Sequence, residues 1–410
     1  RRLADAGRRA YVRGDYAAAI GLLERAAALV PAGELDLPLE TELVEALWAG
    51  GRGDAALQRA AAAAERASAA GERLGELCAR IQEGRLRTFL DPEGATEEVD
   101  KIARAALPEF EAAGDHRALY VAYEALGQVA NMRAQADAGL DAYERAAVHA
   151  QRSGLPYDFL AWRGTFRIEG ATPIPDVLAW LDAQEPRGTE RTWIQRQRAR
   201  ALSMLGRFDE ARPLLDTAAT DLGDRGDRGG IATLDGFGRV EFELLAGDAA
   251  RAVEAGEASC RILAELGELS LLSSVSGYLA RALYEADRLD EADAWAARAA
   301  ELGASDDALT QYLWRQTRAK VLARRGEHAE AERLAREAVM IADGTGFLNG
   351  QADAYADLGE VLVLAGRADE AVEALRGALE RYERKENLVG AERTRSRLSE
   401  LDAARTTPMA

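Results

Sequence analysis

The chain of 410 residues has little cysteine, little proline, few aromatic residues and no apolar run of about 18 residues. Its two cysteines, Cys78 and Cys260, are too few and too far apart for a disulfide framework or a zinc site. Both fall within helical patterns, so we interpret them as small core residues. Ten prolines and 6% aromatic residues favour helix over sheet, and no transmembrane helix is predicted.

Basic residues are also in the minority. The chain has 52 Lys and Arg against 70 Asp and Glu, which gives a formal net charge of −18. An acidic chain repels phosphate backbones, so we expect no nucleic-acid partner. The low cysteine content fits a cytoplasmic location. Because the chain begins at Arg1 inside a helical repeat, we expect it to be part of a longer protein.

A short motif recurs at a fixed spacing. Gly-Arg-Phe-Asp-Glu-Ala at 206–211 returns in related form at 287–292 and 366–371, with weaker copies at 247–252 and 326–331. The last alanines of the five copies, at positions 211, 252, 292, 331 and 371, are 41, 40, 39 and 40 residues apart. A fixed period of this size predicts a stacked solenoid.

The local spacing resembles the tetratricopeptide repeat. Ala19, Leu23 and Ala26 share a helix face, and Pro31 ends that helix. Each repeat of that family is a pair of helices, with helix A followed by a turn and helix B. Two sets of residues match its helix A pattern: Tyr123, Leu126, Gly127 and Ala130, and Tyr355, Leu358, Gly359 and Leu362. We therefore expect an all-α, right-handed α-solenoid of about ten helix pairs plus a C-terminal capping helix near 388–402.

Proline and glycine divide the array. Four prolines, at 156, 173, 175 and 186, cluster in one short stretch, which predicts irregular backbone. The glycine-rich segment 221–230 predicts a mobile loop. The predicted divisions are an N-terminal sub-array at 1–152, an irregular Pro-rich break with a degenerate repeat at 153–190, a C-terminal sub-array at 191–402, and a disordered tail at 403–410.

No pattern in the sequence predicts catalysis. A phosphate-binding Gly-Lys-Ser/Thr loop is absent. His116, His149 and His328 are isolated from one another along the chain, so we expect no catalytic residue, no metal site and no cofactor. The recurring Asp-Glu pairs occupy the start of helix B, where carboxylates cap free N–H groups, and their repetition argues against a catalytic dyad: Asp209-Glu210, Asp290-Glu291 and Asp369-Glu370.

The family resemblance places helix A on the concave face and so supplies a candidate site. Late in helix A, one inward position per repeat holds Arg200, Glu241, Arg281, Lys320 and Glu360. One turn earlier lie Arg196, Phe237, Gly277, Gln316 and Ala356, and one turn later Ser203, Leu244, Tyr284, Ala323 and Val363. We predict that an acidic peptide or anionic ligand binds at Trp193, Arg196, Arg200, Arg281, Tyr284, Gln316 and Lys320.

A second candidate is Trp48, which projects late from a helix A at the other end of the array. The alternative for the basic strip is a solvated row whose cations pair with Glu241 and Glu360. On either interpretation the positions are solvated, so we expect reversal of Arg200, Arg281 and Lys320 to glutamate to leave the fold intact.

Several segments resemble the C-terminal tetratricopeptide region of large actinobacterial signalling proteins that join a class III adenylate/guanylate cyclase domain to a STAND-type ATPase. The segments are Gln311–Arg315, Arg318–Arg324, 331–339, Leu379–Val389 and Gly238–Glu241. Related tails occur on ATPase-type transcriptional regulators. The resemblance implies a non-catalytic regulatory module that binds a ligand or protein partner to control an upstream ATPase or cyclase. The alternatives are a free-standing scaffold that docks acidic peptides, a sensor tail of a STAND transcriptional regulator and an enzyme with a novel helical site.

Overall fold

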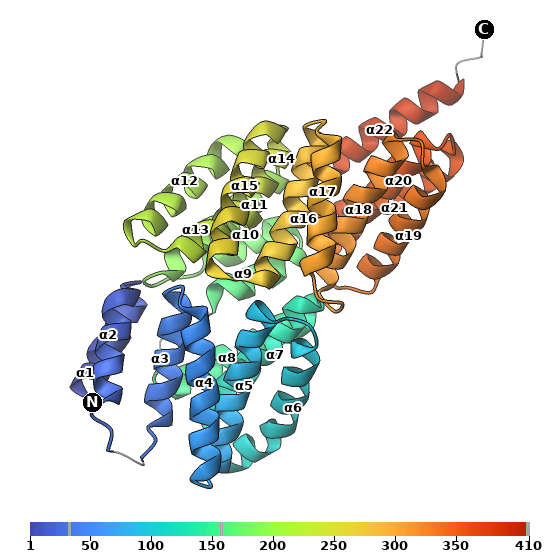
Figure 1. The fold of residues 1–410 in the computed structure, drawn as a ribbon. Helices are drawn as coiled ribbons and strands as arrows, with labels where there is room; N and C mark the ends of the chain where they lie inside the picture. Colours follow the sequence, from blue (N-terminus) through green and yellow to red (C-terminus); the bar gives the residue numbers. More distant parts are fainter. Residues whose placement is uncertain (32–33, 156, 158, 407–410) are drawn as a thin grey trace.

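The computed structural model describes residues 1–31, 34–155, 157 and 159–406, and all regular elements in these residues are helices (Figure 1). The elements of the first five repeats are α1 (Arg2–Val12), α2 (Tyr16–Ala27), α3 (Leu37–Ala49), α4 (Gly53–Ala69), α5 (Arg73–Leu90), α6 (Ala95–Ala113), α7 (His116–Met132), α8 (Ala136–Arg152), α9 (Leu160–Glu169) and α10 (Ile174–Asp182).

The remaining elements are α11 (Glu190–Met204), α12 (Phe208–Asp224), α13 (Arg228–Leu234), the π-helical turn η1 (Asp235–Arg239), α14 (Val240–Ala246), α15 (Ala249–Leu266), α16 (Leu269–Glu285), α17 (Leu289–Leu302), α18 (Ala308–Arg324), α19 (His328–Asp343), α20 (Leu348–Leu364), α21 (Ala368–Lys385) and α22 (Leu388–Thr406). With α13, η1 and α14 taken as one helix A, the described residues form ten helix pairs and a final helix. The predicted all-α solenoid is confirmed.

Two local predictions need correction. The predicted loop at 221–230 is mostly helix, since α12 continues to Asp224 and α13 begins at Arg228. The final helix α22 extends to Thr406, beyond the predicted boundary at 402, and residues 407–410 of the predicted tail lie outside the described residues. The predicted break contains the short helices α9 and α10, and its status as a separate region stays a prediction.

The recurring Asp-Glu pairs lie in the first turn of α12, α17 and α21, where they oppose the helix dipole as expected. The N-cap residue before each pair is an arginine without a side-chain cap hydrogen bond, and the side chain of that arginine binds the glutamate. Arg207 donates to Glu210 at 2.7 Å, for example, and Arg288 and Arg367 bind Glu291 and Glu370 in the same way. Side-chain caps come instead from Asp15, Asp36, Asp115, Asp227, Asp248 and Asp307.

Within a repeat, helices A and B touch at the small residues that the family pattern requires. A Cβ atom placed on Gly359 would lie 2.8 Å from Leu375 of the paired helix, and one on Gly127 would lie 2.5 Å from the Tyr143 ring. Only glycine allows this approach. The helix-face alanines complete the contact, since Ala211, Ala252, Ala292, Ala331 and Ala371 are fully buried.

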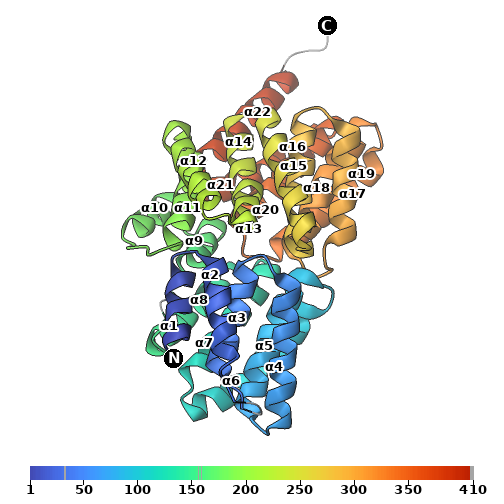
Figure 2. The same ribbon diagram turned by 60° about the vertical axis from the view of Figure 1, so that its left-hand side comes forward.

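The superhelix is coiled tightly enough for successive turns to stack as two tiers (Figures 1 and 2). We call repeats 1–4 (α1–α8) the lower tier, and repeats 6–10 with α22 (α11–α22) the upper tier; repeat 5 joins them. We call the turn inside a helix pair an A–B turn, and the turn leading to the next pair a B–A turn. The A–B turns of the lower tier meet the B–A turns of the upper tier.

Contacts between the tiers follow a constant offset. At the A–B turn of repeat 3, Glu93 accepts a hydrogen bond from the Ser305 hydroxyl at 2.8 Å. At the A–B turn of repeat 4, Ala134 O accepts from Gly346 N at 2.8 Å. Each of these contacts joins an A–B turn to the B–A turn about five repeats later. The same offset brings Gly14 of repeat 1 next to Arg225, and Gly51 of repeat 2 next to Leu266.

Candidate functional site

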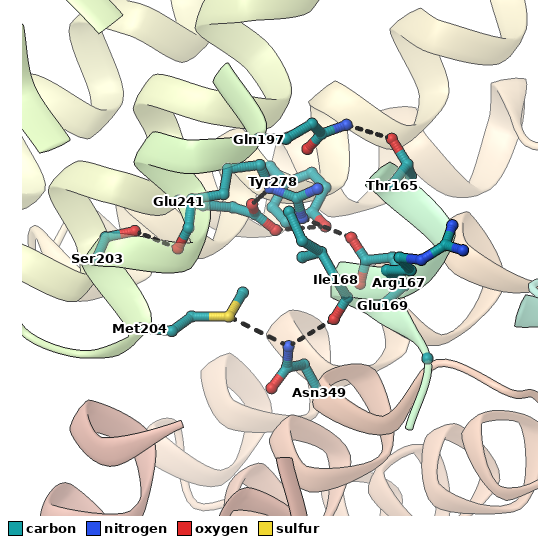
Figure 3. A network of polar contacts seen from close by, with 12 residues as sticks. Thr165, Arg167, Ile168, Glu169, Gln197, Ser203, Met204, Glu241, Tyr278 and Asn349 are labelled. Atoms are coloured by element: carbon teal, nitrogen blue, oxygen red, sulfur yellow. Dashed lines mark hydrogen bonds and ion pairs between the residues drawn. The ribbon is translucent and has the colours of Figure 1, made fainter. Parts of the chain in front are cut away.

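Closure of the upper tier turns its helix A face into an interior, and Glu169, Glu241 and Tyr278 lie close together in one part of it (Figure 3). Arg200 of α11 pairs with both of these glutamates. Its Nε donates to Glu241 of η1–α14 at 2.7 Å, and its Nη2 donates to Glu169 of α9. The Tyr278 hydroxyl of α16 donates to Glu241 at 3.1 Å. Burial alone would lower the pKa of Arg200, but Glu241 and Glu169 hold it above its ordinary value.

A second ionic cluster joins α16, α18 and α20. Arg281 pairs with Asp353 at 2.6 Å, and the Tyr284 hydroxyl donates to Glu360 at 2.5 Å. The fully buried Lys320 ammonium pairs with Asp357 at 3.0 Å and lies 4.4 Å from the centre of the Tyr284 ring. Burial opposes the charge of Lys320, but Asp357 and Glu360 raise its pKa above the ordinary value. Helices two repeats apart are thus bonded across the interior.

Two residues of the predicted strip lack such partners. Arg196 is 7% exposed and, among the described residues, forms no ion pair; its Nε is buried without a hydrogen-bond acceptor. Its guanidinium lies 5.3 Å from the Trp193 ring. Burial and the neighbouring charge of Arg200 lower the pKa of Arg196 to about 9. Gln316 is 2% exposed, and neither of its amide atoms has a hydrogen-bond partner in the described part of the chain.

These positions overturn the expected solvent exposure of the strip. Arg196, Arg200, Tyr284, Gln316 and Lys320 are buried, and Arg281 is half-buried. The register was correct, because the residues do share the inner face of helix A. The predicted pairing of Arg200 with Glu241 is present, but in a closed interior rather than on a solvated row. Ligand binding by the strip stays a prediction.

The sequence analysis named Glu241 and Glu360 but missed three other carboxylates that face the strip, which are Glu169, Asp353 and Asp357. Asp353 and Asp357 lie four residues apart on α20, and Glu360 follows three residues later, so all three occupy one helix face. This acidic row was visible in the sequence. Glu169 was not, since it belongs to the short repeat 5, which carries little of the repeat pattern.

Trp48, the second candidate, lies apart from this interior, on α3 of the lower tier. Its ring packs against Phe89 of α5 with centroids 4.9 Å apart, and it also borders the turn at Gly53. Its side chain is half-buried. A binding role for Trp48 stays a prediction.

The histidines need a correction. His116 at the start of α7 and His149 near the end of α8 are not isolated, because their Nδ1 atoms lie 3.0 Å apart. Burial and the neighbouring His116 lower the pKa of His149. Within the described ranges, no three His, Cys, Asp or Glu side chains gather as a metal site would require. Cys78 and Cys260 are buried and free, as predicted. No helix in those ranges is long and apolar enough to cross a membrane.

Comparison with known proteins bears on the fold. No protein-family model and no curated protein matches the chain. Among solved structures, a Rap protein complexed with competence and sporulation factor is similar at 13% identity and a TM-score of 0.51, over 90% of this chain and 96% of that one. At that identity the likeness supports the fold and nothing more.

Two further solved structures are similar at lower scores. A STAND protein with a tetratricopeptide repeat sensor from Pyrococcus horikoshii has 11% identity and a TM-score of 0.45, over 75% of this chain and half of that one. The APC/C hetero-tetramer Cut9–Hcn1 has 12% identity and a TM-score of 0.47, over 97% of this chain and 89% of that one. The chain is an all-α repeat solenoid, and tetratricopeptide-repeat proteins are among its structural neighbours.

Proposed function

We propose that the chain is a non-catalytic interaction module that binds an acidic protein segment or anionic ligand inside its upper tier and thereby controls an attached ATPase or cyclase. One observation carries the proposal: Arg196 is a buried cation without an ion-pair partner, in an interior where Arg200, Arg281 and Lys320 all have carboxylates. Buried unpaired charge is costly, so its presence calls for an explanation. An anion supplied by a partner would complete the site.

Gln316 supports the same location. It occupies the same register position as Arg196, three repeats further on, and its unpartnered amide can both donate and accept. Together the two side chains suit a ligand that combines an anionic group with amide or hydroxyl groups. A peptide with an acidic side chain has that combination.

Binding there requires the upper tier to open, because both side chains are nearly inaccessible. A partner that binds only the open form shifts the closed–open equilibrium toward it. Opening would move repeat 5 relative to the end of α21, to which it is bonded through Lys385 in the closed form. Such a movement gives the module a way to influence a domain joined to the array.

The proposal predicts that Arg196→Met removes binding without loss of stability. The substitution gives up one cation–π contact, worth about 1–2 kcal/mol, and removes a desolvated charge beside Arg200. Replacing a buried charge by an apolar side chain often stabilises by about 1–4 kcal/mol. We expect unfolding in urea to show unchanged or increased stability, by up to about 2 kcal/mol.

Binding is measured with peptides selected from a random displayed library on the immobilised chain. We expect acidic sequences to be enriched, and their affinity to fall at least about tenfold for Arg196→Met, the loss of one charge-assisted contact. Arg198→Met is the matched control, since Arg198 lies on the same helix but pairs with Asp182 at the surface. Equal losses in both variants, or no acidic enrichment, would reject the interior site.

The finer parts of the proposal rest on the sequence resemblance. The attached ATPase or cyclase, the cytoplasmic location and the absence of a nucleic-acid partner are consistent with the net charge of −18 and with the repeat architecture. A free-standing scaffold for acidic peptides would use the same interior site. The two are distinguished by whether the bound peptide alters the activity of an ATPase or cyclase encoded in the same chain.

A further inference from the structure

Two histidines of repeat 4 form a pair of nitrogen ligands in the lower tier. His116 is the first residue of α7, and His149 lies three residues before the end of α8. They are 33 residues apart in the sequence, but packing of the two helices against each other places their Nδ1 atoms 3.0 Å apart. Both residues are partly exposed, so an ion can reach them from solvent. The expectation of no metal site rested on treating these histidines as isolated, and that premise does not hold for this pair.

Both histidines are carried by rigid structure. The His149 ring stacks on the Tyr123 ring of α7, with the centroids 5.6 Å apart and an interplanar angle of 10°. The first turn of α7, which carries His116, is fixed by Asp115, whose side chain accepts hydrogen bonds from two backbone N–H groups of that turn at 3.0 Å. Ligands held in this way lose little conformational freedom when they bind an ion.

The separation of the two nitrogens suits a single metal ion. Imidazole nitrogens bind divalent zinc at about 2.0–2.1 Å, and an ion at such a distance from two atoms 3.0 Å apart would bind them at an angle of about 90–100°. Neighbouring ligands of a square-planar or tetragonal site are at about 90°, and that geometry with nitrogen and oxygen ligands is typical of Cu²⁺ and Ni²⁺. Two side chains do not make a closed structural site, which takes four protein ligands, but water can complete an open one.

We propose that His116 and His149 bind one Cu²⁺ or Ni²⁺ ion through their Nδ1 atoms, with water at the remaining positions. Without metal, one imidazole donates its Nδ1–H to the other ring. Binding moves that proton to Nε2 of the same ring, so that both Nδ1 lone pairs face the ion. Among the charges that act on His149, Glu111 of α6 favours a cation, whereas Arg145 and Arg152 of α8 oppose it. The bound ion would join the first turn of α7 to the last turn of α8.

The test is calorimetric titration of the chain with Ni²⁺ at pH 7.5, above the ordinary histidine pKa of about 6.5. We expect one ion per chain at the pair. The affinity should fall at least about tenfold in His116→Ala and in His149→Ala, because a single imidazole cannot chelate the ion. The double variant should bind about as weakly as either single variant, since the two ligands act as a unit. His328→Ala is the matched control: His328 is exposed on α19, and its loss should leave the affinity unchanged.

Thermal unfolding gives a second readout that needs no folded alanine variant. An ion that binds only the folded chain raises its melting temperature, so Ni²⁺ should do so for the unmodified chain and for His328→Ala, and not for variants of the pair that fold. A site elsewhere, such as the terminal amine, would survive in the double variant. No binding by the unmodified chain up to about 1 mM Ni²⁺, equal affinity in the double variant, or loss in only one single variant would overturn the proposal. Neither histidine lies in the upper tier, so the outcome does not depend on the interior site.

Discussion

Arg200→Glu should unfold the upper tier or destabilise it by about 3–5 kcal/mol, the cost of breaking a buried ion pair. The substitution removes the only cation that bonds both Glu169 and Glu241 among the described residues, and it places a third carboxylate beside them. If Arg200 were solvated, as the sequence analysis expected, the same substitution would leave the stability nearly unchanged. Urea unfolding followed by circular dichroism measures the loss.

The matched control is Arg198→Glu, two residues away on α11. Arg198 is 44% exposed, and its partner Asp182 lies at the surface, where an ion pair contributes about 0–1 kcal/mol. We therefore expect Arg198→Glu to unfold at nearly the same urea concentration as the unmodified chain. If Arg200→Glu does so too, the interior is open to water and the ionic cluster is not closed.

Lys385→Met should cost about 2–3 kcal/mol, from three lost hydrogen bonds, and loosen the contact between repeat 5 and the end of α21. The buried Nζ donates to the carbonyl oxygens of Arg167 and Gly170 at 2.7 Å and of Thr172 at 2.6 Å. Burial lowers the pKa of this amine to about 7, whereas three acceptors around one nitrogen favour the ammonium form. Methionine fills the space but leaves three carbonyls without a donor.

Hydrogen exchange at pH 6, where the amine is charged, locates the effect. We expect faster exchange in α9, α10 and the end of α21 of Lys385→Met than in the unmodified chain, with α7 and α8 unchanged. Lys101→Met is the control, because Lys101 is exposed on α6. Uniformly faster exchange over both tiers would show that Lys385 contributes general stability and does not specifically join repeat 5 to α21.

The repeat architecture could be predicted from the sequence because its signals are local. The alanine at the start of helix B and the glycine found in most A–B turns recur about every 40 residues, and both kinds of residue act within one helix pair. The prediction of a loop at 221–230 was wrong because it also rested on a local signal alone. The glycines of that segment suggested a break, but only Arg225, Gly226 and Asp227 separate the two helices.

The closed interior could not be predicted, because it depends on contacts between distant repeats. Lys385 bonds carbonyls more than 210 residues away, and Ser305 bonds Glu93 across 212 residues. No periodic signal records such pairs. Register alone correctly identified which residues share the inner face, but it could not show that Glu169 and Asp353 would close over them.

The stacked tiers and the closed interior both depend on the tight coiling of the superhelix, so a cross-link between the tiers tests that coiling most directly. Glu93→Cys and Ser305→Cys, in a chain with Cys78→Ala and Cys260→Ala, place two exposed thiols where the native side chains are bonded at 2.8 Å. A short bis-maleimide should join them within a single chain, whereas Glu93→Cys with Asp209→Cys should not react intramolecularly. An absence of cross-linked single chains in the first pair would contradict the stacked, closed superhelix.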